Sequence, residues 1–312
     1  MMRAVLVMLL SLVLVCSCTD AAQESDDGLV IVASSFPCYD AARAVLGGTK
    51  GLTILLPPGT DTHSFEPTID DVVGIQECDL FIYVGGESDG WLDSLLSSLD
   101  EDVTTFALVD NVPLLLEEET DGILEEEGHE DHDHGHGVVD EHVWTSLGNE
   151  IAIIDSLCSL MSSLDRDGEE EYRRNADRYI SSLEEIRAEV WTIVQDARRH
   201  EIVVADRFPL LYFATEAGLD WVAAYPGCAR QSEPSLRTVA ALVDRIEEDD
   251  IPVVLHMEMA NTMLSQVVAE ETGAEVMEFS SCHNVTRRQF EAGVTYVDLM
   301  KSNIEVLKEA LN

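Results

Sequence analysis

Short apolar runs alternate with longer amphipathic stretches from residue 29 onward. The short runs have the length and composition of buried strands, and the stretches between them repeat apolar residues with a helical period. In the first part of the chain, the predicted strands are residues 29–36, 52–57, 79–86 and 103–109, and the predicted helices are residues 39–47 and 68–78. Alternation of strand and helix predicts a parallel sheet with helices on both faces.

One regular element is much longer than the others. Residues 167–200 contain no proline, and their only glycine is Gly168 at the start. The apolar positions between Tyr172 and Ala197 follow a 3.6-residue period rather than a strict heptad, which favours one long helix over a coiled coil. At 1.5 Å per residue such a helix would span roughly 45–50 Å, the width of a whole domain. The pattern therefore predicts a stiff connector.

Strands and helices alternate again after this connector. The predicted strands are residues 201–206, 219–225, 251–258 and 274–280, and the predicted helices are residues 235–249, 263–273 and 295–311. The expected fold is α/β: two parallel-sheet lobes joined by one long rigid helix, with a ligand site in the cleft between them. The expected divisions are an N-terminal lobe at 29–165, a connecting helix at 166–200 and a C-terminal lobe at 201–312.

The first residues carry targeting information rather than fold information. Residues 1–17 combine Arg3 with an apolar run that is too short for a comfortable membrane span, which is typical of a signal peptide. Ser17 before Cys18 is similar to a bacterial lipobox, so Cys18 is expected to be acylated, with residues 18–28 as a polar tether. Ordinary secretion without acylation is the alternative. Either way, the protein is expected outside the cytoplasm.

Charge and cysteine usage narrow the function classes. The chain has 61 acidic residues against 18 Lys and Arg, a net charge of −43, which excludes nucleic acid as a partner and favours cations. The cysteines beyond the lipobox form no close CxxC pair, so a zinc ribbon is not expected. Disulfides are permitted outside the cytoplasm, and Cys228 and Cys282 could pair.

Ligand-type side chains follow strands in both predicted lobes. Open α/β sheets bind ligands at the carboxyl ends of their strands, so the cleft between two such sheets is the expected site. His63 follows a predicted strand and Asp206 sits at the end of one. His142 follows a very polar segment, with Trp144 expected to pack beneath it. His283, after the last strand, supplies the fourth candidate, because imidazole is a common ligand for borderline metals. The competitors for that fourth position are Ser280, Cys282 and Glu258.

Each candidate also has a purely structural explanation. The two histidines of the first lobe could be hydrogen-bonded within their loops, Asp206 could pair with Arg207, and Asn284 could satisfy His283. A metal site is favoured because four such residues occur at matching topological positions.

Several segments together carry a family resemblance. These are PPGTDTHSFEPT at 57–68, CDLFIYVGGESDGWLDSLL at 78–96, an Asp- and His-rich loop, and DEHVWTS at 140–146. The chain resembles the zinc- and manganese-binding solute receptors of bacterial ATP-binding-cassette importers. The resemblance implies a metal held between the lobes, with His63 and His142 as ligands from the first. It places Asp206 where His or Glu is usual, and the segment with His283 where a carboxylate is usual.

The histidine-rich loop at 125–137 is a separate feature. It is too polar and too rich in glycine to hold a fixed geometry. Because family receptors for zinc often carry such a loop, we expect it to collect metal beside the main site. A plain solvated acidic loop is the alternative. The histidines of this auxiliary loop are His129, His132, His134 and His136.

The expected function is capture of Zn²⁺ and its delivery to the permease of an ATP-binding-cassette transporter, by a monomer. Imidazole ligands favour Zn²⁺, and Asp206 makes Mn²⁺ the alternative metal. The rival function classes are a zinc-dependent hydrolase and a surface adhesin. The chain contains no HExxH or GxxxxGK[ST] motif, so neither of these catalytic motifs supports an enzyme.

Overall fold

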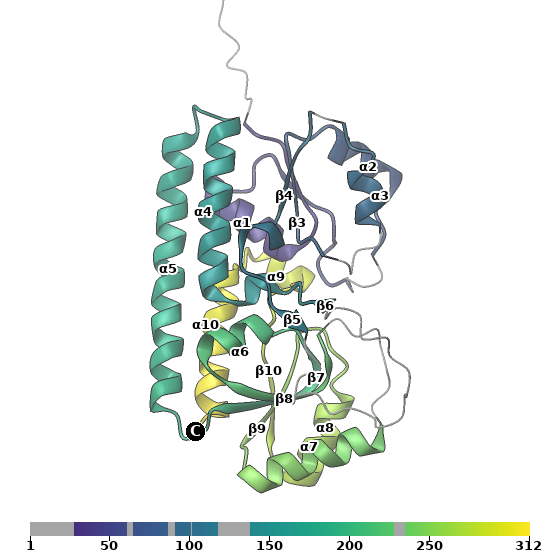
Figure 1. The fold of residues 1–312 in the computed structure, drawn as a ribbon, viewed down its shortest axis with the longest axis vertical. Coiled ribbons are helices and arrows are strands. Elements are labelled where there is room, and N and C mark those ends of the chain that lie inside the picture. The colour runs from purple at the N-terminus through teal and green to yellow at the C-terminus, as the bar shows by residue number, and fades with distance from the viewer. Residues whose placement is uncertain (1–27, 61–64, 87–90, 101, 118–137, 228–234) are drawn as a thin grey trace, which may run out of the picture.

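The computed structural model describes residues 28–60, 65–86, 91–100, 102–117, 138–227 and 235–312. Over these ranges the chain forms two α/β lobes, one above the other, with long helices running along one side of both (Figure 1). The prediction of two parallel-sheet lobes is confirmed.

The first lobe contains a four-stranded parallel sheet in the order β2-β1-β3-β4. Its strands are β1 (Ile31–Ala33), β2 (Leu52–Ile54), β3 (Leu80–Tyr83) and β4 (Thr104–Ala107). Its helical segments are α1 (Phe36–Leu46), α2 (Ile69–Gln76), α3 (Leu92–Leu96) and η2 (Val109–Asn111). Helix α1 covers one face of the sheet, and α2 and α3 pack on the other through an apolar cluster around Ile75 and Phe81.

The second lobe repeats this plan with the strand order β10-β9-β7-β8. Its strands are β7 (Glu201–Phe208), β8 (Asp220–Pro226), β9 (Val253–His256) and β10 (Glu275–Glu278). Its helices are α6 (Leu211–Ala217), α7 (Leu236–Asp249), α8 (Met263–Thr272), α9 (Arg287–Glu291) and α10 (Tyr296–Ala310). Along β7, Val203 faces the cluster under α7 and α8, and Val204 faces the opposite core, as the period of a strand requires.

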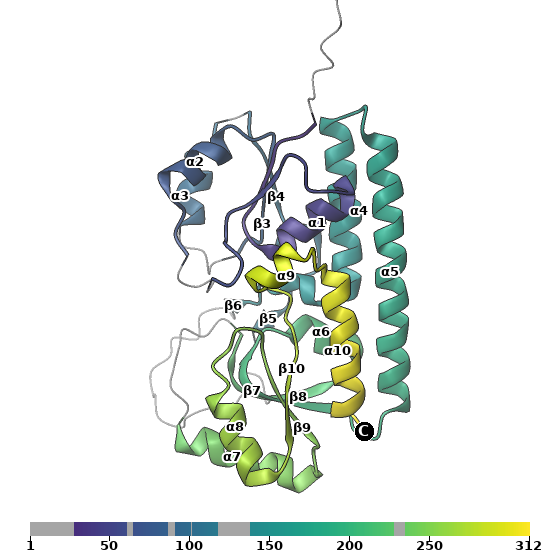
Figure 2. The same ribbon diagram turned by 180° about the vertical axis from the view of Figure 1, so that it is seen from behind.

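Two antiparallel helices, α4 (Leu147–Leu164) and α5 (Glu169–Asp196), form the spine; α5 runs beside both lobes, whereas α4 lies beside the first lobe (Figure 2). The predicted long helix is α5. It ends at Asp196 rather than at the predicted residue 200, because Arg198 and Arg199 turn away and donate their backbone N–H groups to the carbonyl of Leu311. Helix α4 was not predicted. Helix α1 also begins earlier than predicted, at Phe36, because Pro37 is tolerated in the first turn of a helix.

One hydrophobic core runs through the spine and into both lobes. It joins Phe36 of α1, Leu147 of α4, Val190 of α5 and Ile304 of α10. A shared core resists wide separation of the lobes, because opening it would expose apolar surface to water. No helix within the described ranges has the length and apolarity needed to cross a membrane.

A two-stranded antiparallel ribbon lies between the lobes (Figure 1). It consists of β5 (Leu116–Glu117) and β6 (Val138–Val139), with Leu116 opposite Val139. The short helix η3 (Val143–Thr145) follows β6 and leads into α4. This connection, residues 140–146, carries the first described candidate ligand.

Candidate metal centre

His142 is buried just ahead of η3, with 4% of its surface exposed. Oδ1 of Asp140 accepts a hydrogen bond from the backbone N of His142 at 2.7 Å and lies 3.0 Å from the Nδ1 atom of its ring. An imidazole that donates through Nδ1 presents Nε2 as its metal-binding atom. Asp140 is completely buried, and its other oxygen, Oδ2, has no hydrogen-bond partner among the described residues.

His283 lies beside His142, although the two are 141 positions apart in the sequence. The two ring centroids are 5.7 Å apart, and the rings meet edge to face. Trp144 contacts both, with centroid distances of 5.4 Å to His142 and 4.9 Å to His283. The prediction that Trp144 packs against His142 is therefore confirmed. Two candidate ligands, one from each half of the chain, thus lie against the same buried indole ring.

Trp144 also ties the two halves together by hydrogen bonds. Its Nε1 donates to the carbonyl of Ser281 at 2.8 Å, and its own carbonyl accepts from the hydroxyl of Tyr296 at 2.8 Å. Both partners belong to the second lobe, whereas Trp144 follows the first sheet in sequence. These bonds fix the distance between the segments that carry His142 and His283.

Glu258 holds the loop that carries His283. Its carboxylate accepts from the backbone N of Ser281 at 2.7 Å, from the Ser281 hydroxyl at 2.7 Å and from the backbone N of His283 at 3.0 Å. Cys282 between them has a positive φ of 58°, which turns the two flanking N–H groups toward the same carboxylate. Burial raises the pKa of Glu258, and these hydrogen bonds oppose that rise. Glu258 therefore has a structural task that competes with metal binding.

The other competitors for the fourth position are also engaged or unreactive. The Ser280 hydroxyl accepts from the backbone N of Cys282 at 3.1 Å. Cys282 is a free, buried thiol, and burial raises its pKa well above the usual range, whereas a metal would require the thiolate. Its possible disulfide partner, Cys228, lies outside the described residues. Among these candidates, His283 best retains the character of a ligand.

Asp206 lies at a bulge in β7, where the register with β8 shifts between Val204 and Arg207. A bulge re-aims the side chain of the extra residue. One oxygen of Asp206 accepts from the backbone N of Arg207 at 2.8 Å, and the other accepts from the backbone N of Met257 at 3.1 Å. Burial is the main reason why its pKa is raised.

Within the described ranges, no three His, Cys, Asp or Glu side chains are grouped closely enough to hold a metal ion. His63 lies outside these ranges, as do the histidines of the 125–137 loop and Cys18. The carbonyl of Thr60, three residues before His63, accepts from Nδ2 of Asn284 at 2.8 Å. The chain that leads to His63 therefore touches the residue next to His283.

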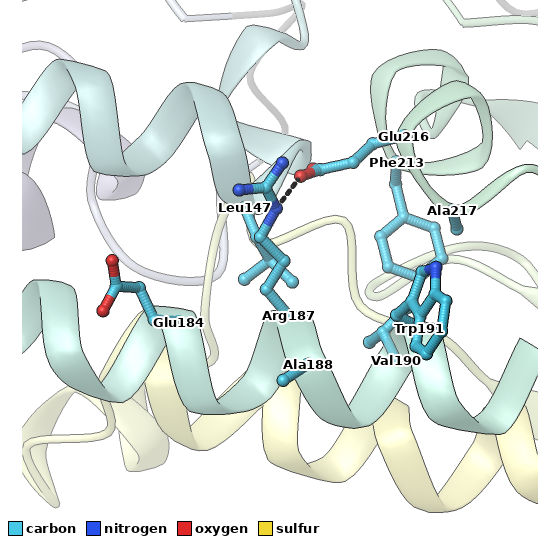
Figure 3. Close-up of a pocket in the computed structure, with 9 residues that line it drawn as sticks. All are labelled: Leu147, Glu184, Arg187, Ala188, Val190, Trp191, Phe213, Glu216 and Ala217. Atoms are coloured by element: carbon cyan, nitrogen blue, oxygen red, sulfur yellow. Dashed lines mark ion pairs between the residues drawn. The ribbon is translucent and has the colours of Figure 1, made fainter.

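A separate pocket of about 440 Å³ lies where α5 meets α6 and the start of α4. Figure 3 shows Trp191 beside Phe213 and Ala217, with Arg187 pointing toward Glu216. The Arg187 Nε atom lies 2.6 Å from Oε1 of Glu216. The His142–His283 pair is not part of its lining.

The sequence contained signals for some of these contacts but not for others. Asp140 precedes His142 by two residues within the DEHVWTS segment, so its role could have been inferred from spacing. Glu216 and Tyr212 of α6 were missed, because this short helix was not predicted. Tyr296 was placed in a helix, but nothing in its surroundings indicated a contact with Trp144.

Comparisons with known proteins place this geometry in context. The family model "ZnuA: Zinc-uptake complex component A periplasmic" matches residues 31–310. The zinc-binding lipoprotein AdcA of Streptococcus pneumoniae is 28% identical over 292 residues, which are 92% of this chain and 56% of AdcA. The high-affinity zinc uptake system protein ZnuA of Bacillus subtilis is 26% identical over 294 residues, covering 93% of this chain and 90% of that protein. The chain thus spans little more than half the length of AdcA.

Solved structures show the same fold. The Zn(II)-bound ZnuA-like domain of S. pneumoniae AdcA aligns with a TM-score of 0.75 at 25% identity, covering 91% of this chain and 99% of that domain. The laminin-binding protein Lmb of Streptococcus agalactiae also aligns with a TM-score of 0.75, at 22% identity, covering 91% of this chain and all of that one. At that identity, the second likeness concerns the fold alone.

Proposed function

This chain belongs to the ZnuA family of periplasmic zinc-uptake components, and we propose on that basis that it captures Zn²⁺ outside the cytoplasmic membrane and delivers it to the permease of an ATP-binding-cassette transporter. The observation that carries the proposal is the approach of His142 and His283, whose ring centroids are 5.7 Å apart. Two imidazoles from distant parts of the chain, one of them oriented by the buried carboxylate of Asp140, would supply half of the ligands of a tetrahedral zinc site.

The proposed ligands are His63, His142, Asp206 and His283. The contact between Thr60 and Asn284 supports His63, because it holds the preceding chain against the loop of His283. For Asp206, the support is its position at the carboxyl end of β7, the usual edge for ligand sites in such sheets. To bind, its carboxylate would have to add a metal to the two backbone N–H groups that it already accepts from.

Zinc is the preferred cargo, and manganese is the alternative metal. Three imidazoles with one carboxylate suit Zn²⁺, whereas Mn²⁺ favours more oxygen ligands. The comparisons point the same way, since AdcA is named as zinc-binding and its ZnuA-like domain was solved with Zn(II) bound. We propose a receptor rather than a zinc hydrolase, because a fourth protein ligand would leave no open position for a reactive water.

Delivery should require only small movements. The spine and the shared core oppose a wide opening of the lobes, so release would come from lobe tilts or movement of the loops that carry His63 and His283. Binding needs neutral imidazoles and an ionised Asp206, so protons compete with the metal and acidification favours release.

The chain is further proposed to be a monomeric lipoprotein. Acylation of Cys18 would anchor it to the outer face of the cell membrane, with residues 18–28 as the tether. AdcA of S. pneumoniae is named a lipoprotein, which supports this location. The 125–137 loop would collect metal at low affinity and raise its concentration beside the cleft.

Calorimetric titration with Zn²⁺ tests the site. Residues 19–312 should show one tight site, which should survive deletion of 125–137 and be lost in His63→Ala and His142→Ala. The control is His200→Ala, which removes an exposed histidine at the end of the spine. Tight binding that disappears with the loop but persists in His142→Ala would mean that the cleft site is wrong.

A manganese titration of the same variants separates the two metals. The account expects tighter binding of Zn²⁺ than of Mn²⁺ at the same site. Tighter binding of Mn²⁺ than of Zn²⁺ would identify the protein as a manganese receptor with the same proposed ligands.

A further inference from the structure

Tyr212 of α6 reaches from the second lobe to the backbone beside His142. Its hydroxyl donates to the carbonyl of Asp140 at 2.8 Å and accepts from the backbone N of Leu115 at 2.9 Å. Only 3% of the residue is exposed. Burial raises the pKa of this hydroxyl to about 12, so it stays protonated, as an ordinary tyrosine also does at physiological pH, and can act as a donor.

The hydroxyl is inserted into a β-ladder. Leu116 pairs with Val139 in the β5–β6 ribbon, so the next opposed residues are Leu115 and Asp140. The backbone N of Asp140 donates to the carbonyl of Leu115 at 3.0 Å, which is one of the two bonds that an antiparallel hydrogen-bonded pair exchanges. The second bond is replaced by the path from Leu115 N through the Tyr212 hydroxyl to the Asp140 carbonyl. The inserted Tyr212 hydroxyl, called the wedge below, therefore ends the direct pairing of the two strands at Leu115 and Asp140.

Asp140, at this point, controls His142. Its Oδ1 atom binds both the backbone N and the ring Nδ1 of His142. A rotation of the Asp140 backbone would carry this carboxylate with it and would turn the imidazole. Consecutive hydrogen bonds therefore connect the Tyr212 hydroxyl to Asp140 and Asp140 to the ring of His142.

One turn later, α6 holds the other end of the same segment. Glu216 accepts from the hydroxyl of Ser146 at 2.7 Å and from the backbone N of Gly148 at 3.1 Å, and it pairs with Arg187. Figure 3 shows this pair bridging α5 and α6. Helix α6 thus fixes the connection around His142 at both of its ends.

We propose that Tyr212 is a positioning residue for metal binding, whose inserted hydroxyl orients His142 through Asp140. The inference rests on the proposed function, since it takes His142 as a ligand. Through Tyr212, the second lobe would orient the ring of His142, although His142 precedes that lobe in the sequence. Movement of α6 would therefore change the affinity of the site without touching the metal.

The test is Tyr212→Phe, which removes one oxygen atom and keeps the ring. Loss of the wedge leaves Leu115 and Asp140 to pair directly, which shifts the Asp140 carboxylate. Removing outer-shell partners of metal-binding histidines typically weakens affinity about 10- to 100-fold, and we expect a loss of that size in the zinc dissociation constant. The matched control is Tyr172→Phe, because Tyr172 is also buried and donates to Asp165 in the turn between α4 and α5.

Two readouts separate positioning from general stability. The ¹⁵N NMR shifts of the His142 ring report how its two nitrogens share the proton, and the visible spectrum of the Co²⁺-loaded protein reports ligand geometry. Both should change in Tyr212→Phe and stay unchanged in Tyr172→Phe. Incorporation of 3-fluorotyrosine at position 212, which keeps the hydroxyl but alters its strength as a donor, should shift the same NMR signals and covers the case in which Phe does not fold.

The outcomes are distinguishable from failure of the proposed function. If His142→Ala binds zinc as tightly as the wild type, the proposed site is wrong. If His142→Ala loses binding while Tyr212→Phe retains the wild-type affinity, NMR shifts and Co²⁺ spectrum, the site stands and the role of Tyr212 is refuted. A lower melting temperature with unchanged affinity and spectra would show a merely structural tyrosine.

Discussion

Replacement of Glu150 by Gln should stabilise the protein increasingly as the pH rises. Glu150 lies in the first turn of α4 and is 1% exposed, and its Oε2 atom has no hydrogen-bond partner among the described residues. Burial raises its pKa well above the usual range, and the nearby charge of Asp40 raises it further. Asp40 is already engaged by the Tyr179 hydroxyl and the backbone N of Tyr296. Because Asp40 is held as an acceptor beside Glu150, Glu150 is the carboxyl of the two that keeps its proton.

The sign follows from proton counts. Above the pKa of the unfolded state, near 4.3 for a model glutamate, the unfolded chain releases this proton while the folded protein keeps it. The folded state then binds more protons, so the free energy of unfolding falls as pH rises, by about 1.4 kcal/mol per pH unit for one proton. The fall continues up to the pKa in the folded protein. Gln cannot ionise, so this contribution disappears in the variant.

The assay is urea unfolding of the wild type and of Glu150→Gln from pH 4 to pH 8, without metal. The difference in unfolding free energy should be smallest at pH 4, should grow by about 1.4 kcal/mol per unit, and should level off at the folded pKa. Glu185→Gln, an exposed change on α5, serves as the control and should show no such slope. A difference that stays constant with pH would refute the reasoning, because it would mean that Glu150 ionises alike in both states.

Three further changes test other parts of the structure. Arg43→Ala leaves Asp40 buried without its cation and removes a 2.8 Å hydrogen bond to the carbonyl of Val294. The free energy of unfolding, measured by thermal unfolding, should fall by roughly 3–5 kcal/mol. A fall below about 1 kcal/mol would contradict this. Trp144→Phe removes the hydrogen bond from the indole N–H to the carbonyl of Ser281 and leaves that carbonyl without this donor. The loss should cost about 1–3 kcal/mol in the same assay, and an unchanged melting temperature would contradict this. Asp206→Asn should weaken zinc binding at pH 7. Because the pKa of Asp206 is raised, wild-type affinity should begin to fall at a higher pH than for an ordinary aspartate, and this part of the pH dependence should vanish in the variant; identical pH profiles would exclude Asp206 as a ligand.

Local periodicity was enough to predict most of the fold. The alternation of strand and helix predicted both parallel sheets, and the apolar stripe predicted α5, because the information for each lies within one element. Helix α4 was overlooked, although its apolar positions include Ile153 and Leu157, both completely buried. The end of α5 depends on Leu311, more than a hundred residues away, and no local pattern encodes that contact.

The candidate site divides in the same way. The expectation of a ligand site between the two sheets placed His142 and His283 near each other, and their rings do meet, although His142 follows a polar segment rather than a predicted strand. The roles of Glu258 and Tyr212 could not be predicted. Glu258 was expected to act chemically, and its anchoring of Ser281 and His283 was missed, because it follows from the turn at Cys282, which has an unusual backbone conformation for a residue with a side chain.

The most direct measurement is anomalous X-ray diffraction at the zinc edge from crystals of the zinc-loaded protein. The account predicts one strong peak in the cleft, about 2.0–2.1 Å from a ring nitrogen of both His142 and His283, the usual length of a zinc–imidazole bond. His63 and Asp206 should complete the shell. A strong peak within residues 125–137, with none between His142 and His283, would contradict the central claim that the two lobes hold the metal between them.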